Sequence, residues 1–288
     1  MKKDTPDSAH SRSSTENKSD NRVAADSSSD GDSVTAVLLG ASNLTLAWPR
    51  LVPLLHERCG APLQILTAHG MGRSYFLDRS GFAFRQLPGI LHCDLWNVLR
   101  EVTECRSVAL ITDIGNDLVY GQSPLMIVDA VRQCILRLRD WRSDCRIVLT
   151  SPPVSSVEAL GAVRFYLFRS ALFPLSRLTL DEVRSRTAEL DLRLRQLADE
   201  LQIPIAQPQP HWYGLDPIHV RRRFQTEAFE RIFACWDIPA PAGRTSGTTP
   251  NSRPRGQRPQ TARYWRFGRE QTTPQPSVVT ARHSVRSY

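Results

Sequence analysis

The sequence predicts a three-layer α/β domain built around a mainly parallel sheet. Two observations favour this fold class. Short, nearly continuous apolar runs recur along the chain and are separated by segments long enough for a helix, which is typical of strands buried on both faces of a parallel sheet. Polar or glycine-containing motifs follow several of these runs directly, as expected where a site forms at the carboxyl ends of parallel strands.

Composition divides the 288-residue chain into three parts. Residues 1–33 are mostly Ser, Asp, Asn, Lys and Thr and cannot bury enough apolar surface to offset chain entropy, so we expect them to be disordered. Residues 240–288 are rich in Pro, Thr, Ser, Gln and Arg and lack a hydrophobic period, so we expect a disordered tail there. Residues 34–239 remain as one folded domain.

Charge follows the same boundaries. Residues 1–33 carry five basic and seven acidic residues, a net charge of −2, and residues 240–288 carry nine Arg and one Glu, a net charge of +8. The domain between them therefore has a net charge of +2 within the chain total of +8. An Arg-rich tail that also holds Tyr264, Trp265 and Phe267 could contact nucleic acid or another polyanion. A solvated extension is the alternative, since no nucleic-acid-binding fold signature accompanies it.

The predicted elements alternate between strand and helix. The five predicted strands are residues 34–39, 62–68, 107–112, 146–150 and 203–206. Helices are predicted from Leu44 to a stop at Gly60, from an N-cap at Ser123-Pro124 to Trp141, from a capping box at Thr179–Glu182 to Leu201, and from about Arg222 to Trp236.

Two places in this pattern are irregular. Pro49 fits a first helical turn, whereas Pro53 is predicted to kink or restart the first helix. Residues 75–96 have no clear period, and a helix near residues 87–91 is expected within them. Their phenylalanines and leucines fit a substrate-facing loop or, alternatively, ordinary packing.

The six cysteines are scattered without a C-x-x-C pair, which favours reduced thiols over a zinc site or a disulfide framework. No apolar run approaches the ~18 residues of a membrane span. Lys2-Lys3 is followed by polar residues where a secretory signal needs an apolar stretch. We therefore expect a cytoplasmic protein that uses no metal and no cofactor.

A candidate nucleophile lies at the exit of the first strand. Ser42 follows Gly40 there, but a serine hydroxyl becomes a good nucleophile only when a base removes its proton and a carboxylate orients that base. His219 and Asp216 provide this pair, three residues apart after the fifth strand. The attack also creates an oxyanion, for which the backbone N–H groups of Ser42 and Gly72 and the amide of Asn116 are suitable donors.

Each of these motifs has a simpler explanation when taken alone. Ser42 fits a helix cap, Gly70 and Gly72 fit a turn, and residues 115–117 form a common turn sequence. The glycines complete neither a G-x-G-x-x-G pattern nor a P-loop, so nucleotide binding is not indicated. Because the motifs all follow strand ends, the ordered set favours a catalytic site over the separate explanations.

The order Gly-x-Ser, Gly, Gly-Asn-Asp and Asp-x-x-His resembles the SGNH (GDSL-type) hydrolase superfamily, from Val34 to about Trp236. The resemblance implies a flavodoxin-like three-layer α/β/α sandwich with five parallel strands. It also implies a metal-independent esterase, lipase, acylhydrolase, carbohydrate deacetylase or acyltransferase. By the same resemblance Ser42 is the nucleophile, Gly72 and Asn116 complete the oxyanion hole, His219 is the general base and Asp216 orients it, with Gly70 as the alternative donor.

The sequence departs from the family pattern at one residue of the nucleophile motif. The usual Gly-Asp-Ser-Leu reads Gly40-Ala41-Ser42-Asn43-Leu44. The absent aspartate does not accept the proton, but in the family it commonly holds neighbouring backbone in place. Asn43 is the candidate to replace that support.

The sequence therefore predicts a serine esterase or acylhydrolase that cleaves a small carboxylic ester through an acyl-enzyme. An acyltransferase would use the same site with a hydroxyl acceptor in place of water. A third hypothesis is a binding module that keeps the fold with a relaxed site and is tethered to a polyanion by the Arg-rich tail.

Overall fold

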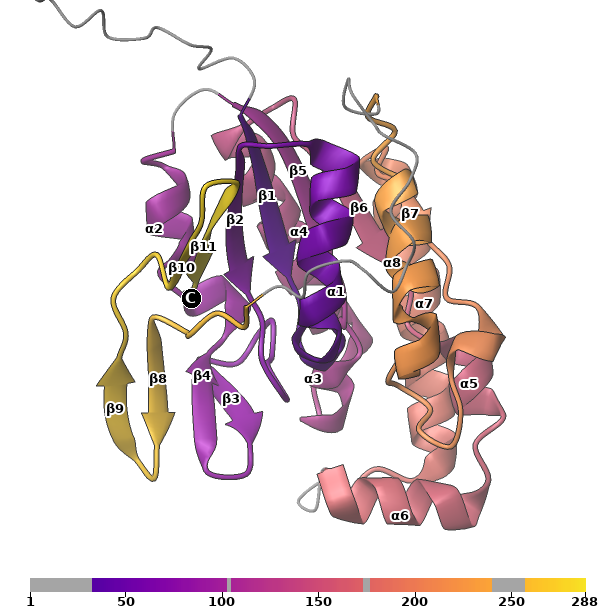
Figure 1. Cartoon of the computed structure of the whole chain (residues 1–288). Coiled ribbons are helices and arrows are strands. Elements are labelled where there is room, and N and C mark those ends of the chain that lie inside the picture. Colours follow the sequence, from indigo (N-terminus) through magenta and orange to yellow (C-terminus); the bar gives the residue numbers. More distant parts are fainter. Residues whose placement is uncertain (1–32, 103–104, 173–176, 240–256) are drawn as a thin grey trace, which may run out of the picture.

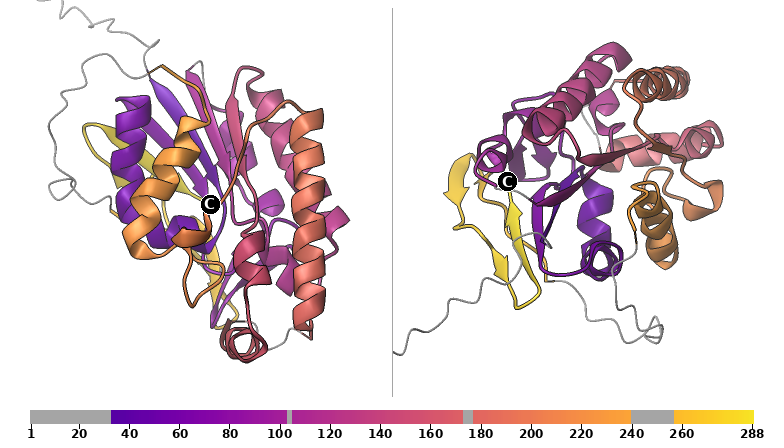
Figure 2. Two further views of the ribbon diagram at one scale, coloured as in Figure 1. Left: turned by 90° about the vertical axis from the view of Figure 1, so that its right-hand side faces the viewer. Right: turned by 90° about the horizontal axis from the view of Figure 1, so that it is seen from above.

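The computed structural model of the chain describes residues 33–102, 105–172, 177–239 and 257–288. The segments 1–32 and 240–256, for which disorder is predicted, lie outside the described residues. Within the described residues the predicted fold class is confirmed, because helices cover both faces of a central sheet (Figures 1 and 2).

The central sheet has seven strands in the order β10-β11-β2-β1-β5-β6-β7. Neighbouring strands are parallel except for the β10–β11 pair. The expected five parallel strands are all present, but the expected total of five is wrong because β10 and β11 extend the sheet at the β2 edge. The strands are β1 (Val34–Leu39), β2 (Leu63–Ala68), β5 (Arg106–Ile111), β6 (Arg146–Thr150), β7 (Ile205–Ala206), β10 (Val278–Val279) and β11 (His283–Ser287).

Alternate residues of the strands bury against opposite helical layers. Ala36 and Leu38 of β1 join the apolar cluster beneath α1 (Ser42–Cys59) and α8 (Gln225–Ala234). Val37 and Leu39 join the cluster beneath the helices of the other face. Those helices are α2 (Leu95–Leu99), α4 (Pro124–Trp141) and α7 (Leu180–Glu200). The shorter elements are η2 (Ile90–His92), α3 (Asn116–Val119), α5 (Val154–Glu158), α6 (Ala162–Leu172), η3 (Pro210–Trp212) and η4 (Arg222–Phe224).

The predicted helix signals are present as hydrogen bonds. The Ser123 side chain accepts from the backbone N–H of Met126 and caps α4, which begins with Pro124. Thr179 and Glu182 form a reciprocal capping box at the start of α7. Gly60 ends α1 with a φ of 88°.

Two local expectations are wrong. Helix α1 does not restart at Pro53 but continues to Cys59, with both prolines inside it. Residues 85–88 form strand β4 (Arg85–Pro88) and not a helix, because their backbone pairs with β3 (Arg79–Phe82) in an antiparallel hairpin. A 3₁₀ turn, η2, follows that hairpin.

The expected disorder of the C-terminal tail is wrong for residues 257–288. Strands β8 (Arg263–Arg266) and β9 (Arg269–Thr272) join the β3–β4 hairpin in a four-stranded sheet of order β3-β4-β8-β9. Strand β11 lies parallel to β2, with His283 opposite Leu63. The backbone edges of β2 and β4 provide these partners, so a polar segment with only a few buried apolar residues such as Trp265 can be ordered.

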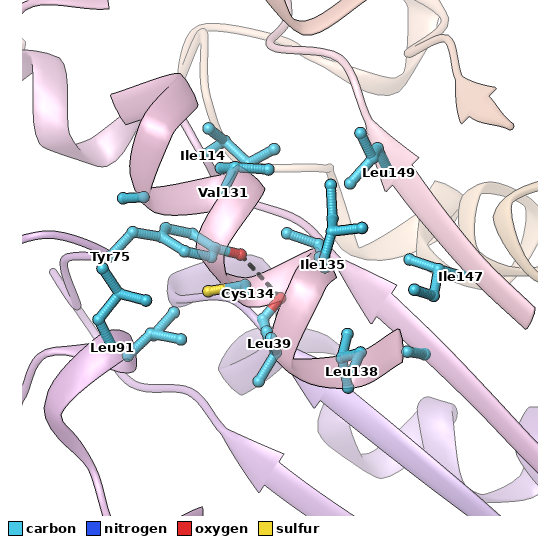
Figure 3. Close-up of a cluster of buried hydrophobic side chains, with 14 of the residues drawn as sticks. Leu39, Tyr75, Leu91, Ile114, Val131, Cys134, Ile135, Leu138, Ile147 and Leu149 are labelled. Carbon is cyan, nitrogen blue, oxygen red and sulfur yellow. Dashed lines mark hydrogen bonds between the residues drawn. The ribbon is translucent and has the colours of Figure 1, made fainter. Parts of the chain in front are cut away.

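Tyr75 links the ends of two strands from within the larger apolar cluster. Figure 3 shows its ring among Leu91, Val131 and Cys134, with its hydroxyl directed at Leu39. The hydroxyl oxygen lies 3.0 Å from the carbonyl oxygen of Leu39 and 2.6 Å from that of Thr112. Burial raises the pKa of Tyr75 well above its ordinary value, so the phenol stays protonated and available as a donor. The contact fixes the loop after β2 to the ends of β1 and β5.

The register aligns the carboxyl ends of the central strands. Leu39 at the end of β1 lies opposite Ala68 of β2 and Ile111 of β5. The loops that carry Ser42, Gly72 and Asn116 therefore begin at the same edge of the sheet.

Candidate active site

Ser42 is the first residue of α1 and its side chain is buried beside the end of β1. The turn that places it needs a glycine, because a Cβ at Gly40 would lie 2.7 Å from Cγ2 of Thr112 and 2.8 Å from Cδ1 of Leu44. The backbone N–H of Ser42 lies in the first turn of the helix, where the helix itself offers no acceptor. The hydroxyl and this backbone donor thus lie together at the sheet edge.

His219 contacts both Ser42 and Asp216. Its Nε2 lies 2.8 Å from Oγ of Ser42, and its Nδ1 lies 2.5 Å from Oδ2 of Asp216. The other oxygen of Asp216 accepts from the backbone N–H groups of Ile218 and His219, at 3.0 and 3.1 Å. These bonds fix the carboxylate on its own loop. A carboxylate on Nδ1 selects the tautomer with the proton there, which leaves Nε2 free to accept from Ser42.

The electrostatics of this group favour a basic imidazole. Burial alone lowers the pKa of His219, but the hydrogen bond and charge of Asp216 and the charge of Asp113 outweigh it, so the pKa is raised above 6.5. Burial raises the pKa of Asp216, but the hydrogen bonds and charge of His219, together with the backbone N–H of Ile218, outweigh it, so that pKa is lowered below 3.8. The pair therefore consists of an ionised carboxylate and an imidazole of increased basicity.

Asp113 holds the backbone on both sides of Ser42. Its Oδ2 accepts from the backbone N–H groups of Ala41 and Asn43, at 2.8 and 3.0 Å, on either side of Ser42. Its Oδ1 accepts from the side-chain amide of Asn43 at 2.6 Å. Asp113 has a φ of 60°, a left-handed conformation that Asp tolerates better than most residues. A carboxylate from the end of β5 thus holds the turn that carries Ser42.

Asn43 connects the nucleophile turn to the histidine loop. Its amide nitrogen also donates to the carbonyl of Ile218 at 3.0 Å, and its amide oxygen accepts from the backbone N–H of Val220 at 2.9 Å. These two bonds hold the residues on both sides of His219. The sequence predicted Asn43 as the support for this turn. In the structure the support comes from Asn43 and Asp113 together, which are hydrogen-bonded to each other.

Asn116 and Gly72 lie in neighbouring loops. The side-chain amide of Asn116 donates to the carbonyl of Arg73 at 3.4 Å, and because an amide has two N–H groups a second donor is left. Gly72 has a φ of 66°, and a Cβ there would lie 2.8 Å from the carbonyl oxygen of Gly81. Within the described residues Gly72 makes no hydrogen bond to Ser42, Asp216 or His219.

Asp117 ties those two loops together. Its buried carboxylate accepts from the hydroxyl of Ser74 and from the backbone N–H of Tyr75, the latter at 2.9 Å. Burial raises the pKa of Asp117, and the hydrogen bonds from Ser74, Tyr75 and Phe76 oppose that shift. The hydroxyl of Tyr120 donates to the carbonyl of Gly72 at 2.5 Å. The position of Gly72 relative to Asn116 is therefore set by contacts along both loops.

An apolar cavity of about 120 Å³ lies beside Ser42. Asn116 and Asp113 line it near Ser42, and most of its remaining wall is hydrocarbon, including Ile114, Leu118, Val157, Tyr213, Ile218 and Phe229. An apolar cavity with a few convergent polar groups is the usual form of a small-molecule site.

Sequence reasoning placed Ser42, Asp216 and His219 together, and the structure brings them into contact. It missed the role of Asp113. The available signal was an acidic residue directly after the predicted third strand, at the same edge as Ser42. Tyr120, which contacts Gly72, was not singled out either.

In the part of the chain that the structure describes, no cluster of three or more His, Cys, Asp or Glu side chains is arranged to hold a metal ion. None of the described helices combines the length and the hydrophobicity needed to cross a bilayer.

No protein-family model and no curated protein matches the chain. Among solved structures, the chain is similar to a carbohydrate acetylesterase family member from Sinorhizobium meliloti, at 18% identity over 71% of this chain and 100% of that one, with a TM-score of 0.48. It is similar to an aryl esterase from M. smegmatis at 14% identity over 69% and 97%, with a TM-score of 0.49. A GDSL-like lipase from Bacteroides thetaiotaomicron matches at 14% identity over 69% and 85%, with a TM-score of 0.42.

Proposed function

We propose that the protein is a serine esterase or acylhydrolase in which Ser42 is the nucleophile, His219 the general base and Asp216 the carboxylate that orients it. The observation that supports this is the continuous set of contacts from Asp216 through the His219 ring to Ser42, at 2.5 and 2.8 Å. Both distances lie within the range of hydrogen bonds required for proton transfer.

In the proposed reaction, Oγ of Ser42 attacks the ester carbonyl carbon while its proton moves to Nε2 of His219. The tetrahedral intermediate collapses, the carbon–oxygen bond of the ester breaks, and the proton passes from His219 to the leaving alcohol. Water then attacks the acyl-enzyme, gives its proton to His219, and releases the acid as the proton returns to Ser42. Asp216 stabilises the imidazolium that forms in each half-reaction. Every proton is carried by His219, so the proposed reaction uses no cofactor.

We infer that the backbone N–H groups of Ser42 and Gly72 and the side-chain amide of Asn116 form the oxyanion hole. Asn116 lines the cavity next to Ser42, and Gly72 lies in the loop that Asn116 contacts through Arg73. Fixed donors of this kind do not reorganise as the negative charge develops, which is why one of them commonly contributes about 3–4 kcal/mol to the transition state.

Asp113 acts in this proposal as a positioning residue. It accepts from the backbone on both sides of Ser42 and raises the pKa of His219 through its charge. It thereby supplies the support that the aspartate absent at Ala41 gives in the SGNH pattern.

The proposed substrate is a small ester with a short acyl group. The cavity of 120 Å³ is close to the volume of about 150 Å³ that holds benzene in an engineered protein cavity, so it accommodates a short acyl group. The six cysteines are free thiols, which agrees with the cytoplasmic location that we propose.

A panel of p-nitrophenyl esters from acetate to decanoate tests this function. The expected result is hydrolysis of the short esters, with kcat/KM falling as the acyl chain lengthens, and its loss in Ser42→Ala. Folded protein that hydrolyses none of them would refute the proposal. Product analysis with an added alcohol separates hydrolysis from acyl transfer, because only transfer yields a new ester.

A further inference from the structure

Two phenylalanines project from the tips of neighbouring hairpins. The β3–β4 and β8–β9 hairpins each have a two-residue loop, and these loops contain Phe84 and Phe267. The rings stack on each other with centroids 5.0 Å apart, and the backbone N–H of Phe267 donates to the carbonyl of Phe84 at 3.1 Å. Yet 69% of Phe84 and 67% of Phe267 is exposed. The pair forms one apolar projection that the fold leaves in contact with solvent.

Folding alone does not explain the residue chosen at Phe267. Phe267 and Gly268 have φ values of 49° and 75°, the pattern of a type I′ turn, which strongly favours Asn-Gly. A phenylalanine in the left-handed region is strained, and a ring this exposed regains little by burial. Position 267 is therefore occupied by an aromatic residue although the turn geometry disfavours one.

A row of arginines lies directly behind these tips. Arg85, Arg266 and Arg269 are cross-strand partners on β4, β8 and β9, so their side chains share one face of the sheet. All three are exposed, and none forms an ion pair with a carboxylate among the described residues. Glu270, the nearest acidic residue along β9, pairs in register with Trp265 and lies on the opposite face. Like charges side by side are unfavourable unless an anion relieves them.

A groove of about 510 Å³ lies beside this row. Its walls include Arg85, Arg266 and Tyr264 together with the two tip phenylalanines. The guanidinium of Arg85 lies over the Tyr264 ring at 4.5 Å, which holds it in place. The order from the tip inward is therefore aromatic first, then cationic, with a polar groove beside the arginines.

Both tips extend on the side of the molecule toward which β1 and β2 point (Figure 1). Helix α1, whose first residue is Ser42, begins after the end of β1 and therefore on that side. A surface bound by the tips would therefore face the same side as the candidate active site.

We propose that Phe84, Phe267 and the row of Arg85, Arg266 and Arg269 form a docking surface for an anionic lipid membrane. Apolar groups at a projecting tip enter the headgroup region, and arginines one or two residues behind them lie at the level of lipid phosphates and carboxylates. Single-stranded nucleic acid fits less well, because base stacking needs open ring faces and these two rings cover one face of each other. This surface does not depend on Ser42 being a nucleophile.

Sedimentation of the full chain with phosphatidylcholine vesicles, with and without phosphatidylserine, tests the proposal. The expected result is binding to the phosphatidylserine vesicles that weakens as salt is added. Failure to sediment with them, or equal binding to both kinds of vesicle, would overturn it. Tighter binding to single-stranded RNA than to these vesicles would also overturn it.

Phe267→Asn gives the sharpest variant, because Asn-Gly suits the turn. It is expected to keep or increase the unfolding midpoint while vesicle binding falls severalfold. Leu192→Asn is the matched control, since Leu192 is 57% exposed on α7. Unchanged binding by Phe267→Asn, or equal losses in both variants, contradicts the proposal.

The charge component has its own matched pair. Arg266→Gln with Arg269→Gln is expected to weaken binding roughly 30-fold, about fivefold for each arginine near an anionic surface. Arg106→Gln with Arg146→Gln removes the same charge from the opposite edge, where β5 and β6 begin, and should change binding little. Equal losses in the two double variants would show a response to net charge alone and reject the surface.

Discussion

Asp113→Asn tests how the turn that carries Ser42 is held. The change removes one charge but keeps the size of the side chain, and Asn tolerates the φ of 60° as Asp does. The carboxylate accepts three hydrogen bonds, at 2.8, 3.0 and 2.6 Å, and an amide has only one oxygen with which to replace it. Facing that oxygen toward the backbone of the turn sets its NH₂ group against the amide of Asn43.

Asn43 cannot relieve this conflict by turning over. Its oxygen accepts from Val220 and its nitrogen donates to Ile218, so a flip would break both bonds. At least one bond to a charged group is therefore lost, which corresponds to about 1.5–3 kcal/mol in the free energy of unfolding. A turn displaced from its productive geometry is expected to lower kcat/KM roughly tenfold, about 1.4 kcal/mol.

The pH profile separates this role from general destabilisation. His219 must be neutral to accept a proton, so kcat/KM of the wild type is expected to fall as pH drops through the raised pKa, above pH 6.5. Removing the charge of Asp113 lowers that pKa and moves the acid limb to lower pH. Asp78→Asn, at an exposed carboxylate, is the control and should leave the limb in place. An Asp113→Asn variant with unchanged kcat/KM and an unchanged acid limb would refute the positioning role.

Three further changes test other parts of the account. Asn116→Ala should lower kcat by about 10²–10³ with little change in KM or the unfolding midpoint. A decrease in kcat of less than threefold in steady-state assays would show that Asn116 is not an oxyanion-hole donor. Gly72→Ala should destabilise the fold in urea titrations by at least about 1–2 kcal/mol, because alanine is strained at a φ of 66° and meets the Gly81 carbonyl; equal stability would contradict this packing. Burial lowers the pKa of His69 to about 3 in the folded protein, against 6.5 when exposed. Between these pH values His69 is protonated in the unfolded protein and neutral in the folded protein. Stability should therefore fall between pH 6.5 and pH 3 by up to about 1.4 kcal/mol per unit, and His69→Gln should lose that slope; an identical slope in both proteins would assign it to other groups.

The five parallel strands could be predicted because each is a short apolar run, and strands such as Val34–Leu39 are buried along their whole length. The same runs predicted the edge at which Ser42 and His219 meet, since carboxyl ends of parallel strands share an edge. The predictions of the strands and of the shared edge both depend on local residue patterns that can be read directly from the sequence.

The strands of residues 257–288 could not be predicted in this way. β9 is exposed along its length, and β11 is ordered by pairing with β2, more than 200 residues earlier in the chain. The composition of a segment indicates whether that segment can form a hydrophobic core by itself. It does not indicate whether the segment can pair with the edge of an existing sheet. The contact of Asp113 with Ala41 and Asn43 was missed for a related reason. It depends on the register of β1 against β5, which places the two strand ends at one level.

Labelling with a fluorophosphonate tests the central claim most directly, because the reagent forms a covalent adduct only with an activated serine. The proposed site predicts one adduct per chain, located on Ser42 by peptide mapping, and its loss in Ser42→Ala and in His219→Ala. An adduct on another serine, or a folded protein that accepts no label, would contradict Ser42 as the nucleophile.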